Sequence, residues 1–171
     1  MIFATVGTHQ QPFARLLSAL SALPPGQLVV QHGYGPAPAG AARAVAFMSY
    51  GEMAEQFEAA DAVVTHSGVG SILLAMRVGH TPIAVPRYSR FGEHVDDHQL
   101  ELTRALAERG HVVPLWAGED LVAKLAVAPP RRPPPEGRAH PIHMAVRAAL
   151  RGERDVPCES AAAGGVGPSA G

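Results

Sequence analysis

A six-residue segment, His66-Ser67-Gly68-Val69-Gly70-Ser71, brings together one imidazole, two hydroxyl groups and two glycines. Imidazole and hydroxyl groups can donate hydrogen bonds, and glycine lets the backbone approach a phosphate closely. An apolar run at 62–65 predicts a buried strand before the segment, and apolar residues at helical spacing predict a helix beginning near Val69. The first N–H groups of a helix bind anions. The segment therefore predicts a phosphate-binding loop, with an ordinary serine-capped connection as the alternative.

The composition indicates one domain with a hydrophobic core and little net charge. Of the 171 residues, 47% are hydrophobic, which is enough for a core of ordinary size. A formal net charge of −1 and the lack of basic runs argue against a nucleic-acid-binding surface. The single cysteine, Cys158, cannot form an internal disulfide, and no apolar run approaches the roughly 20 residues that span a bilayer. We expect a cytoplasmic protein with no membrane span of its own.

Strands and helices are expected to alternate along the chain. Six strands are predicted, at 2–6, 28–31, 44–47, 62–65, 82–85 and 112–115. Helices are predicted from the first turn at Pro12, over 49–60, from 69 to about 79, from about Asp96 to 110, and over 119–126. This alternation predicts an α/β fold, a doubly wound, parallel, six-stranded Rossmann-like sheet with the order 3-2-1-4-5-6.

That strand order would bring two polar loops together. Strands one and four are neighbours in it, and ligands bind beyond the carboxyl ends of the strands where the order reverses. Gly7-Thr8-His9 follows the first strand, and the 66–71 segment follows the fourth. We therefore expect a nucleotide site where these two loops meet.

The domain organisation follows from the composition of the second half. Residues 1–127 are expected to form the nucleotide-binding domain, and 128–141 a stiff linker rich in proline. A further helix is expected over 142–151. The Ala/Gly/Ser-rich segment 152–171 is expected to be disordered.

Several common chemistries lack their sequence signals. The chain has no G-x-G-x-x-G after the first strand, no P-loop and no G-x-S-x-G elbow. Nine histidines make a metal site an alternative, with His94 and His98 flanking Asp96 and Asp97, and His66 as a further candidate ligand. Because His94 is expected to precede the helix, the two histidines need not share a face. We expect no metal.

Three segments in order resemble a family of glycosyltransferases. The 66–71 segment resembles the H-x-G-x-x-S phosphate motif of nucleotide-sugar enzymes of the GT-B type, and residues 1–115 resemble the C-terminal donor-binding domain of glycosyltransferase family 28. Segments 5–13 and 92–100 resemble those of one-domain subunits of two-part enzymes. One group of these two-part enzymes builds bacterial exopolysaccharide. Another is the eukaryotic dolichol-linked GlcNAc transferase. The resemblance implies the C-terminal half of a GT-B fold.

The resemblance also implies roles for particular residues. A UDP-sugar would be the donor substrate, with no separate cofactor. The donor diphosphate would lie among Gly7, Thr8, His66, Ser67, Gly68, Gly70 and Ser71. The base would be held by Phe47, Tyr50 and Met53, although plain core packing is the alternative for Phe47 and Met53. The transferred sugar would contact Asp97, His98 and Gln99, and the local candidates for a catalytic base are His9 and His98.

One departure from the family pattern leaves a second hypothesis open. Many relatives place a Glu for the ribose hydroxyls where this chain has Leu74, and a leucine cannot accept those hydrogen bonds. The first hypothesis is a donor-binding subunit that moves a hexosyl group to a lipid-linked or polysaccharide acceptor. It would be active only with a membrane-anchored, acceptor-binding partner subunit. The alternative is a non-catalytic nucleotide-binding or scaffolding module.

Overall fold

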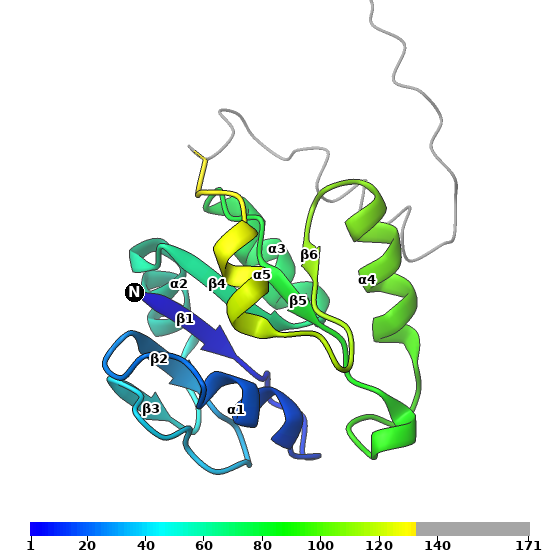
Figure 1. The fold of residues 1–171 in the computed structure, drawn as a ribbon, viewed down its shortest axis with the longest axis horizontal. Helices are drawn as coiled ribbons and strands as arrows, with labels where there is room; N and C mark the ends of the chain where they lie inside the picture. Colours follow the sequence, from blue (N-terminus) through cyan, green and yellow to red (C-terminus); the bar gives the residue numbers. More distant parts are fainter. Residues whose placement is uncertain (133–171) are drawn as a thin grey trace, which may run out of the picture.

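The structure is a computed structural model, and it describes residues 1–132 of the chain. Six strands form one sheet with the order β3-β2-β1-β4-β5-β6, and every neighbouring pair is parallel (Figure 1). The strands are β1 (Ile2–Thr5), β2 (Leu28–Gln31), β3 (Arg43–Val45), β4 (Ala62–His66), β5 (Ile83–Val85) and β6 (Val113–Pro114). The expected fold class and strand order are confirmed.

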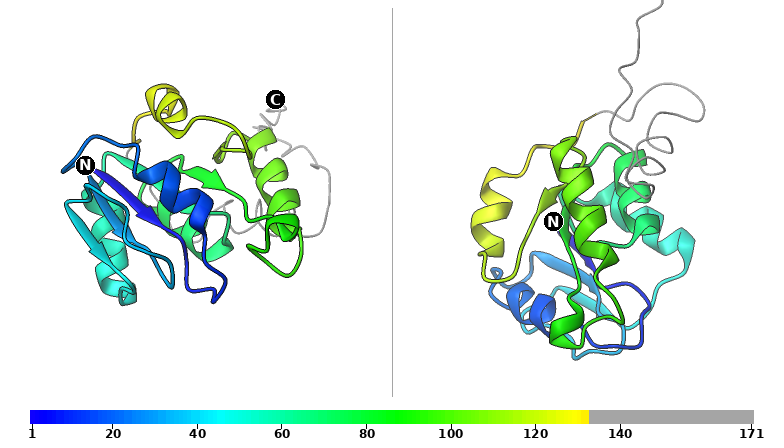
Figure 2. Two further views of the ribbon diagram at one scale, coloured as in Figure 1. Left: turned by 60° about the horizontal axis from the view of Figure 1, so that its bottom comes forward. Right: turned by 90° about the vertical axis from the view of Figure 1, so that its right-hand side faces the viewer.

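Helices cover both faces of the sheet, as Figure 2 shows from two further directions. They are α1 (Ala14–Leu20), α2 (Tyr50–Ala59), α3 (Val69–Arg77), α4 (His98–Glu108) and α5 (Leu121–Val127), with a short 3-10 helix, η1 (Ser89–Phe91). Buried residues of α1 and α5 share one core cluster on one face. On the other face, α2 and α3 share a second cluster, and α3 and α4 share a third.

The central strand β1 shows why its sequence lacks a clean alternation of apolar and polar residues. Phe3 points to the α2 side, where its ring meets Phe57 edge-on with centroids 5.2 Å apart. Ala4 points to the opposite side and packs with Leu16 and Leu20 of α1. A strand covered on both faces needs apolar side chains in both directions. The sheet is thereby a rigid platform for the loops at its carboxyl edge.

Several element boundaries differ from the sequence expectations by one or two residues. Helix α1 begins at Ala14, with Phe13 at its N-cap, so Pro12 precedes the first turn. The third strand ends at Val45 instead of 47. Helix α4 begins at His98 rather than Asp96, because Asp96 accepts a hydrogen bond from the backbone N–H of His98 and shapes the turn before the helix.

Some expectations fall partly or wholly outside the described residues. The expected helix at 142–151, the tail at 152–171 and the linker beyond 132 lie there.

Within the described part of the chain, the capping box that was expected for α2 is present, with Ser49 and Glu52 each bonding the backbone of the other. No helix in this part is long and apolar enough to cross a membrane.

Candidate functional site

A cleft opens at the carboxyl edge of the sheet, where the chain leaves β1 and β4. These two strands are paired in register, with Thr5 opposite Thr65, so their ends lie side by side. The cleft has a volume of about 780 Å³ and is lined by Thr8, His9, Gln10, Gln11, Pro12, His66 and Gln99. We call it the histidine cleft. The two polar loops expected to meet at this edge do meet there.

The His66 ring lies wedged between two glycines. A Cβ atom added to Gly7 would lie 2.5 Å from the Nε2 atom of His66, and one added to Gly68 would lie 2.2 Å from it. Both distances are far shorter than any real contact between a Cβ and a nitrogen atom. Gly7 also has a φ of +80°, a conformation that L side chains rarely adopt. Both positions therefore require glycine if the imidazole is to keep its place.

This imidazole is neutral at physiological pH. Burial lowers the pKa of His66 to about 4, with the positive charge of Arg87 as the second cause and the Thr5 backbone acting in the opposite direction. Its Nδ1 atom is buried and has no hydrogen-bond partner among the described residues. A neutral imidazole carries one N–H donor and one acceptor nitrogen. In the tautomer that carries its proton on Nε2, the ring can donate one hydrogen bond to a ligand without adding a charge.

The first turn of α3 stands beside this ring with open backbone donors. Gly68 is the N-cap and offers no side-chain cap. Ile72 is the first residue of the helix whose N–H bonds to the N-cap carbonyl, at 3.1 Å. The N–H groups of Val69, Gly70 and Ser71 therefore precede the helical ladder, at the positive end of the helix dipole. The geometry fits an anion in front of the turn.

The two serines of the segment differ. Ser67 is buried, and its hydroxyl lies 2.6 Å from the hydroxyl of Thr103 in α4. That contact ties the end of β4 to α4, and neither serine is among the residues that line the histidine cleft. Ser71 lies half-buried in the open first turn of α3. Of the two hydroxyl groups, that of Ser71 is the better placed for an anion.

His9 enters the histidine cleft from the loop after β1. Its ring tilts against that of His94, with centroids 4.7 Å apart. Burial lowers the pKa of His9, the neighbouring His94 and Arg87 lower it further, and Asp96 raises it. The neutral form is thus favoured near pH 7, and neutral imidazole can accept a proton.

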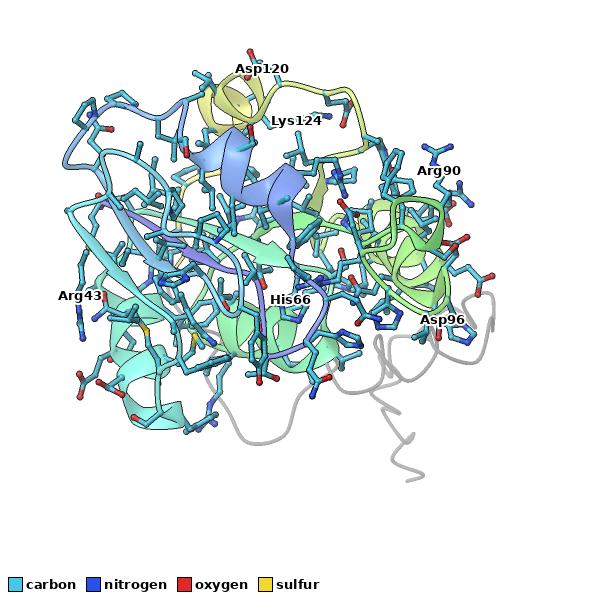
Figure 3. All side chains as sticks on the ribbon, turned by 90° about the horizontal axis from the view of Figure 1, so that it is seen from below. Arg43, His66, Arg90, Asp96, Asp120 and Lys124 are labelled. Carbon is cyan, nitrogen blue, oxygen red and sulfur yellow. The ribbon has the colours of Figure 1, made fainter. Side chains whose placement is uncertain are left out.

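The three residues expected to contact the sugar do not lie together. Gln99 lines the histidine cleft, and its Oε1 atom accepts a hydrogen bond from the backbone N–H of Arg87 at 3.1 Å. The side chain of His98 is 82% exposed and lies near Asp96 and Glu101. In Figure 3, His66 lies among the central side chains, whereas Asp96 and Arg90 lie toward the periphery.

Asp97 belongs to a different hollow. It accepts a hydrogen bond from the backbone N–H of Ser89 at 2.9 Å. It also lines a second cavity of about 510 Å³, together with Tyr88, Arg90, Leu100, Arg104 and Trp116. The start of α4 thus contributes Gln99 to the histidine cleft and Asp97 to this second cavity.

The residues expected to hold a base lie on the α2 side of the molecule. Phe47 is 47% exposed and meets the ring of Tyr34 edge-on at 5.2 Å. Tyr50 is 71% exposed at the start of α2. Met53 is half-buried against the cluster that contains Phe3, and Leu74 packs against the same cluster. Met53 and Leu74 thus both contribute to core packing.

The histidine-rich turn does not form a metal centre. The Nδ1 atom of His94 lies 3.1 Å from Asp96, and His98 approaches the other oxygen of Asp96 at 4.0 Å. Across residues 1–132, no group of three or more His, Cys, Asp or Glu side chains is arranged to hold a metal ion.

Sequence reasoning missed a fully buried arginine behind the histidine cleft. Arg87 follows β5 by two residues, and its guanidinium bonds to the backbone on both sides of the loop that carries His9. The available signal was an arginine two residues after a buried apolar strand, with Glu93 six residues later. The cleft-lining residues Gln10, Gln11 and Pro12 were likewise not singled out for the site.

Comparison with known proteins places this arrangement in a family. Residues 1–128 match the model of the glycosyltransferase family 28 C-terminal domain, a range that includes the histidine cleft and all six strands. Neither the curated proteins nor the solved structures gave a match. The match confirms the family resemblance, and a C-terminal domain of this family indicates binding of a glycosyltransferase donor. The chain belongs to glycosyltransferase family 28, and its residues 1–128 match the C-terminal domain of that family.

Proposed function

We propose that this chain is the donor-binding subunit of a glycosyltransferase that takes a hexosyl group from a UDP-sugar. The acceptor would be lipid-linked or a growing polysaccharide, reached at the cytoplasmic face of a membrane through an anchored partner subunit. One observation carries the proposal: a neutral imidazole, fixed between Gly7 and Gly68, stands beside the open N-terminus of α3. This arrangement suits a diphosphate in a donor-binding domain of this family.

The proposed chemistry assigns the leaving group to α3. When the bond from the sugar to UDP breaks, negative charge builds up on the departing diphosphate. Backbone N–H groups at the start of α3, the Ser71 hydroxyl and one N–H of His66 would donate to that charge. Thr8 and the backbone around Gly7 would complete the enclosure from the other loop. These donors are fixed before the reaction begins, so they need little rearrangement during it.

Removal of the acceptor proton is assigned to His9 among the local histidines. His9 lines the histidine cleft, and its lowered pKa favours the neutral form that can accept a proton. His98 is exposed beyond the lining of the cleft, so it would need a different arrangement to serve as the base. Gln99 would contact the transferred sugar through its amide NH₂ group, since its oxygen already accepts a hydrogen bond from the backbone N–H of Arg87.

The acceptor side of the reaction is assigned to the partner. The histidine cleft is one wall of an active site, and glycosyl transfer requires an oriented acceptor and exclusion of water. The partner would supply the facing wall, the acceptor site and the membrane anchor. The base of the nucleotide would lie over Phe47 and Tyr50, whose rings are exposed and available for stacking.

The test begins with binding of UDP, measured by calorimetry on the purified chain. Transfer from several UDP-sugars to membrane acceptors is then assayed with and without candidate partner subunits. We expect UDP binding by the chain and transfer only with the partner. Robust transfer by the chain alone would overturn the two-subunit proposal. Binding without transfer in every combination would favour a non-catalytic module, and no binding would overturn both.

A variant of Gln99 sharpens this test. Gln99→Ala should weaken binding of the UDP-sugar roughly tenfold, because a hydrogen bond to the sugar is lost. UDP affinity should change much less, because in this proposal Gln99 contacts the sugar and not the nucleotide. Equal losses for the two ligands would remove Gln99 from the proposed sugar site.

A further inference from the structure

Arg87 is the largest fully buried side chain among the described residues, with 0% of its surface exposed. Its guanidinium donates three hydrogen bonds to backbone carbonyl oxygens, those of Val6 at 2.8 Å, Gln11 at 2.8 Å and Glu93 at 2.9 Å. The same group lies 4.5 Å from the centre of the Phe13 ring. A buried cation therefore joins the loop after β1 to the loop after β5.

The carboxylate of Glu93, which lies near Arg87, already forms an ion pair with Arg15. Glu93 accepts two hydrogen bonds from Arg15, each at 3.0 Å, and a third from the backbone N–H of Tyr88. The hydrogen bond from Arg87 to Glu93 goes to the backbone carbonyl oxygen of Glu93 and not to its carboxylate. The cluster thus contains two cations, Arg15 and Arg87, and one anion. Its net charge of +1 stands directly behind the histidine cleft.

No residue that lines the histidine cleft carries a fixed positive charge. The lining contains two histidines, and the pKa values of both are lowered, with Arg87 among the causes for each. Val6 and Gln11, which Arg87 holds, bracket the cleft-lining loop that includes Thr8 and His9. The field of this guanidinium therefore reaches the cleft even though the guanidinium itself does not line it.

We propose that Arg87 is a positioning residue for the donor diphosphate, one that supplies positive charge from behind the cleft wall and fixes the His9 loop. This inference rests on the proposed function. Burying a cation is costly, and the three carbonyl oxygens offset only part of that cost. A dianionic or trianionic ligand in the cleft would gain from the remaining charge, because protein around the guanidinium screens it less than water and salt would.

The experiment compares UDP with uridine, which has no phosphate. Arg87→Met removes the charge and keeps much of the side-chain volume, whereas Arg87→Lys keeps the charge and loses the planar fork. Arg77→Met, at the exposed C-terminal turn of α3, is the matched control for loss of one positive charge. Affinities are measured by calorimetry, and circular dichroism reports on folding.

We expect Arg87→Met to weaken UDP binding about 30-fold while uridine affinity changes less than about threefold, since a neutral ligand gains little from the charge. Arg87→Lys should keep most of the preference for UDP over uridine, and Arg77→Met should leave both affinities unchanged. Equal losses of affinity for UDP and uridine in both Arg87 variants would mean that Arg87 only stabilises the structure of the loop, and they would overturn the proposal. Failure of the wild-type chain to bind UDP would instead overturn the proposed function.

Two measurements keep the proposal testable if Arg87→Met does not fold. Arg87→Lys is then read alone, and loss of its preference for UDP counts against the role of the charge. The wild-type chain is also titrated with UDP at low and high salt. A buried charge predicts that UDP affinity falls only a few-fold between 0.05 M and 1 M salt. A much steeper fall would assign the interaction to exposed cations and overturn the proposal.

Discussion

The histidine cleft and the second cavity are both lined by residues at the start of α4, and they place their arginines differently. In the second cavity, Arg90 lies 4.9 Å from the Tyr88 ring centre, and Arg104 lies 5.9 Å from that of Trp116. Both arginines are exposed. In the histidine cleft the donors on the surface are neutral, and the cation behind them, Arg87, is buried.

This difference indicates what each hollow can hold selectively. Exposed arginines attract any anion, and salt weakens that attraction because the charges are in contact with solvent. Neutral donors with a buried charge behind them favour a ligand whose shape lets it reach the donors. The fixed imidazole and the open turn of α3 are therefore the features on which the proposed recognition of a diphosphate depends. The four predictions below alter one side of this comparison at a time.

The largest effect is expected where the His66 ring has no space to move. Gly68→Ala would place a Cβ atom 2.2 Å from the Nε2 atom of His66, so the ring must leave its position. We expect UDP affinity to fall more than about 100-fold, because the imidazole donor and the geometry of the turn are lost together. Calorimetry with UDP measures the change.

Gly70→Ala is the matched comparison two residues along the same turn. A Cβ atom at Gly70 meets nothing within 4 Å, and the substitution keeps the backbone N–H. Its effect on UDP affinity should therefore be at least tenfold smaller than that of Gly68→Ala. Similar losses of UDP affinity in the two variants would mean that this turn needs glycine for its backbone flexibility and not to leave space for the imidazole.

The second prediction concerns stability between pH 7 and pH 4.5. Because burial lowers the pKa of His66 to about 4, the folded chain keeps this ring neutral while the unfolded chain protonates it below pH 6.5. The unfolded state then binds more protons, so the free energy of unfolding falls as the pH falls. We expect His66 to account for about 2 kcal/mol of that loss.

Urea denaturation of the wild-type chain and of His66→Gln at both pH values measures this contribution. The variant cannot titrate at this position, so its stability should depend less on pH by the stated amount. Parallel pH profiles for the two proteins would show that His66 is not held neutral by burial.

The sequence predicted the fold more fully than the site, for reasons visible in particular residues. Apolar runs such as 62–65 and the polar loops after them report on local structure, and the parallel topology then places those loops together. Asp97 and Gln99 are two residues apart, yet they line different hollows because a helix turns about 100° per residue. Arg87 bonds to residues 81 and 76 positions away, and no local pattern encodes such contacts.

The third prediction separates the two serines of the 66–71 segment. Ser71→Ala should weaken UDP binding roughly tenfold, which is the effect of losing one hydrogen bond to a charged group. Ser67→Ala should act mainly on stability, because its hydroxyl is buried against that of Thr103. Thermal denaturation and UDP titration of both variants check the assignment. A larger loss of UDP affinity in Ser67→Ala than in Ser71→Ala would reverse it.

The smallest effect is expected from the exposed arginines of the second cavity. Arg90 and Arg104 stack on aromatic rings, and among the described residues neither forms an ion pair. Arg90→Met and Arg104→Met should each change UDP affinity less than about twofold at physiological salt, because exposed charges are screened there. Arg87→Met removes the same formal charge from the buried side and should change UDP affinity far more.

If all three variants lost UDP affinity equally, net charge near the carboxyl edge would matter and the burial of Arg87 would not. Repeating the titrations at low salt adds a sharper comparison, since the effects of Arg90→Met and Arg104→Met should then increase while that of Arg87→Met stays nearly constant.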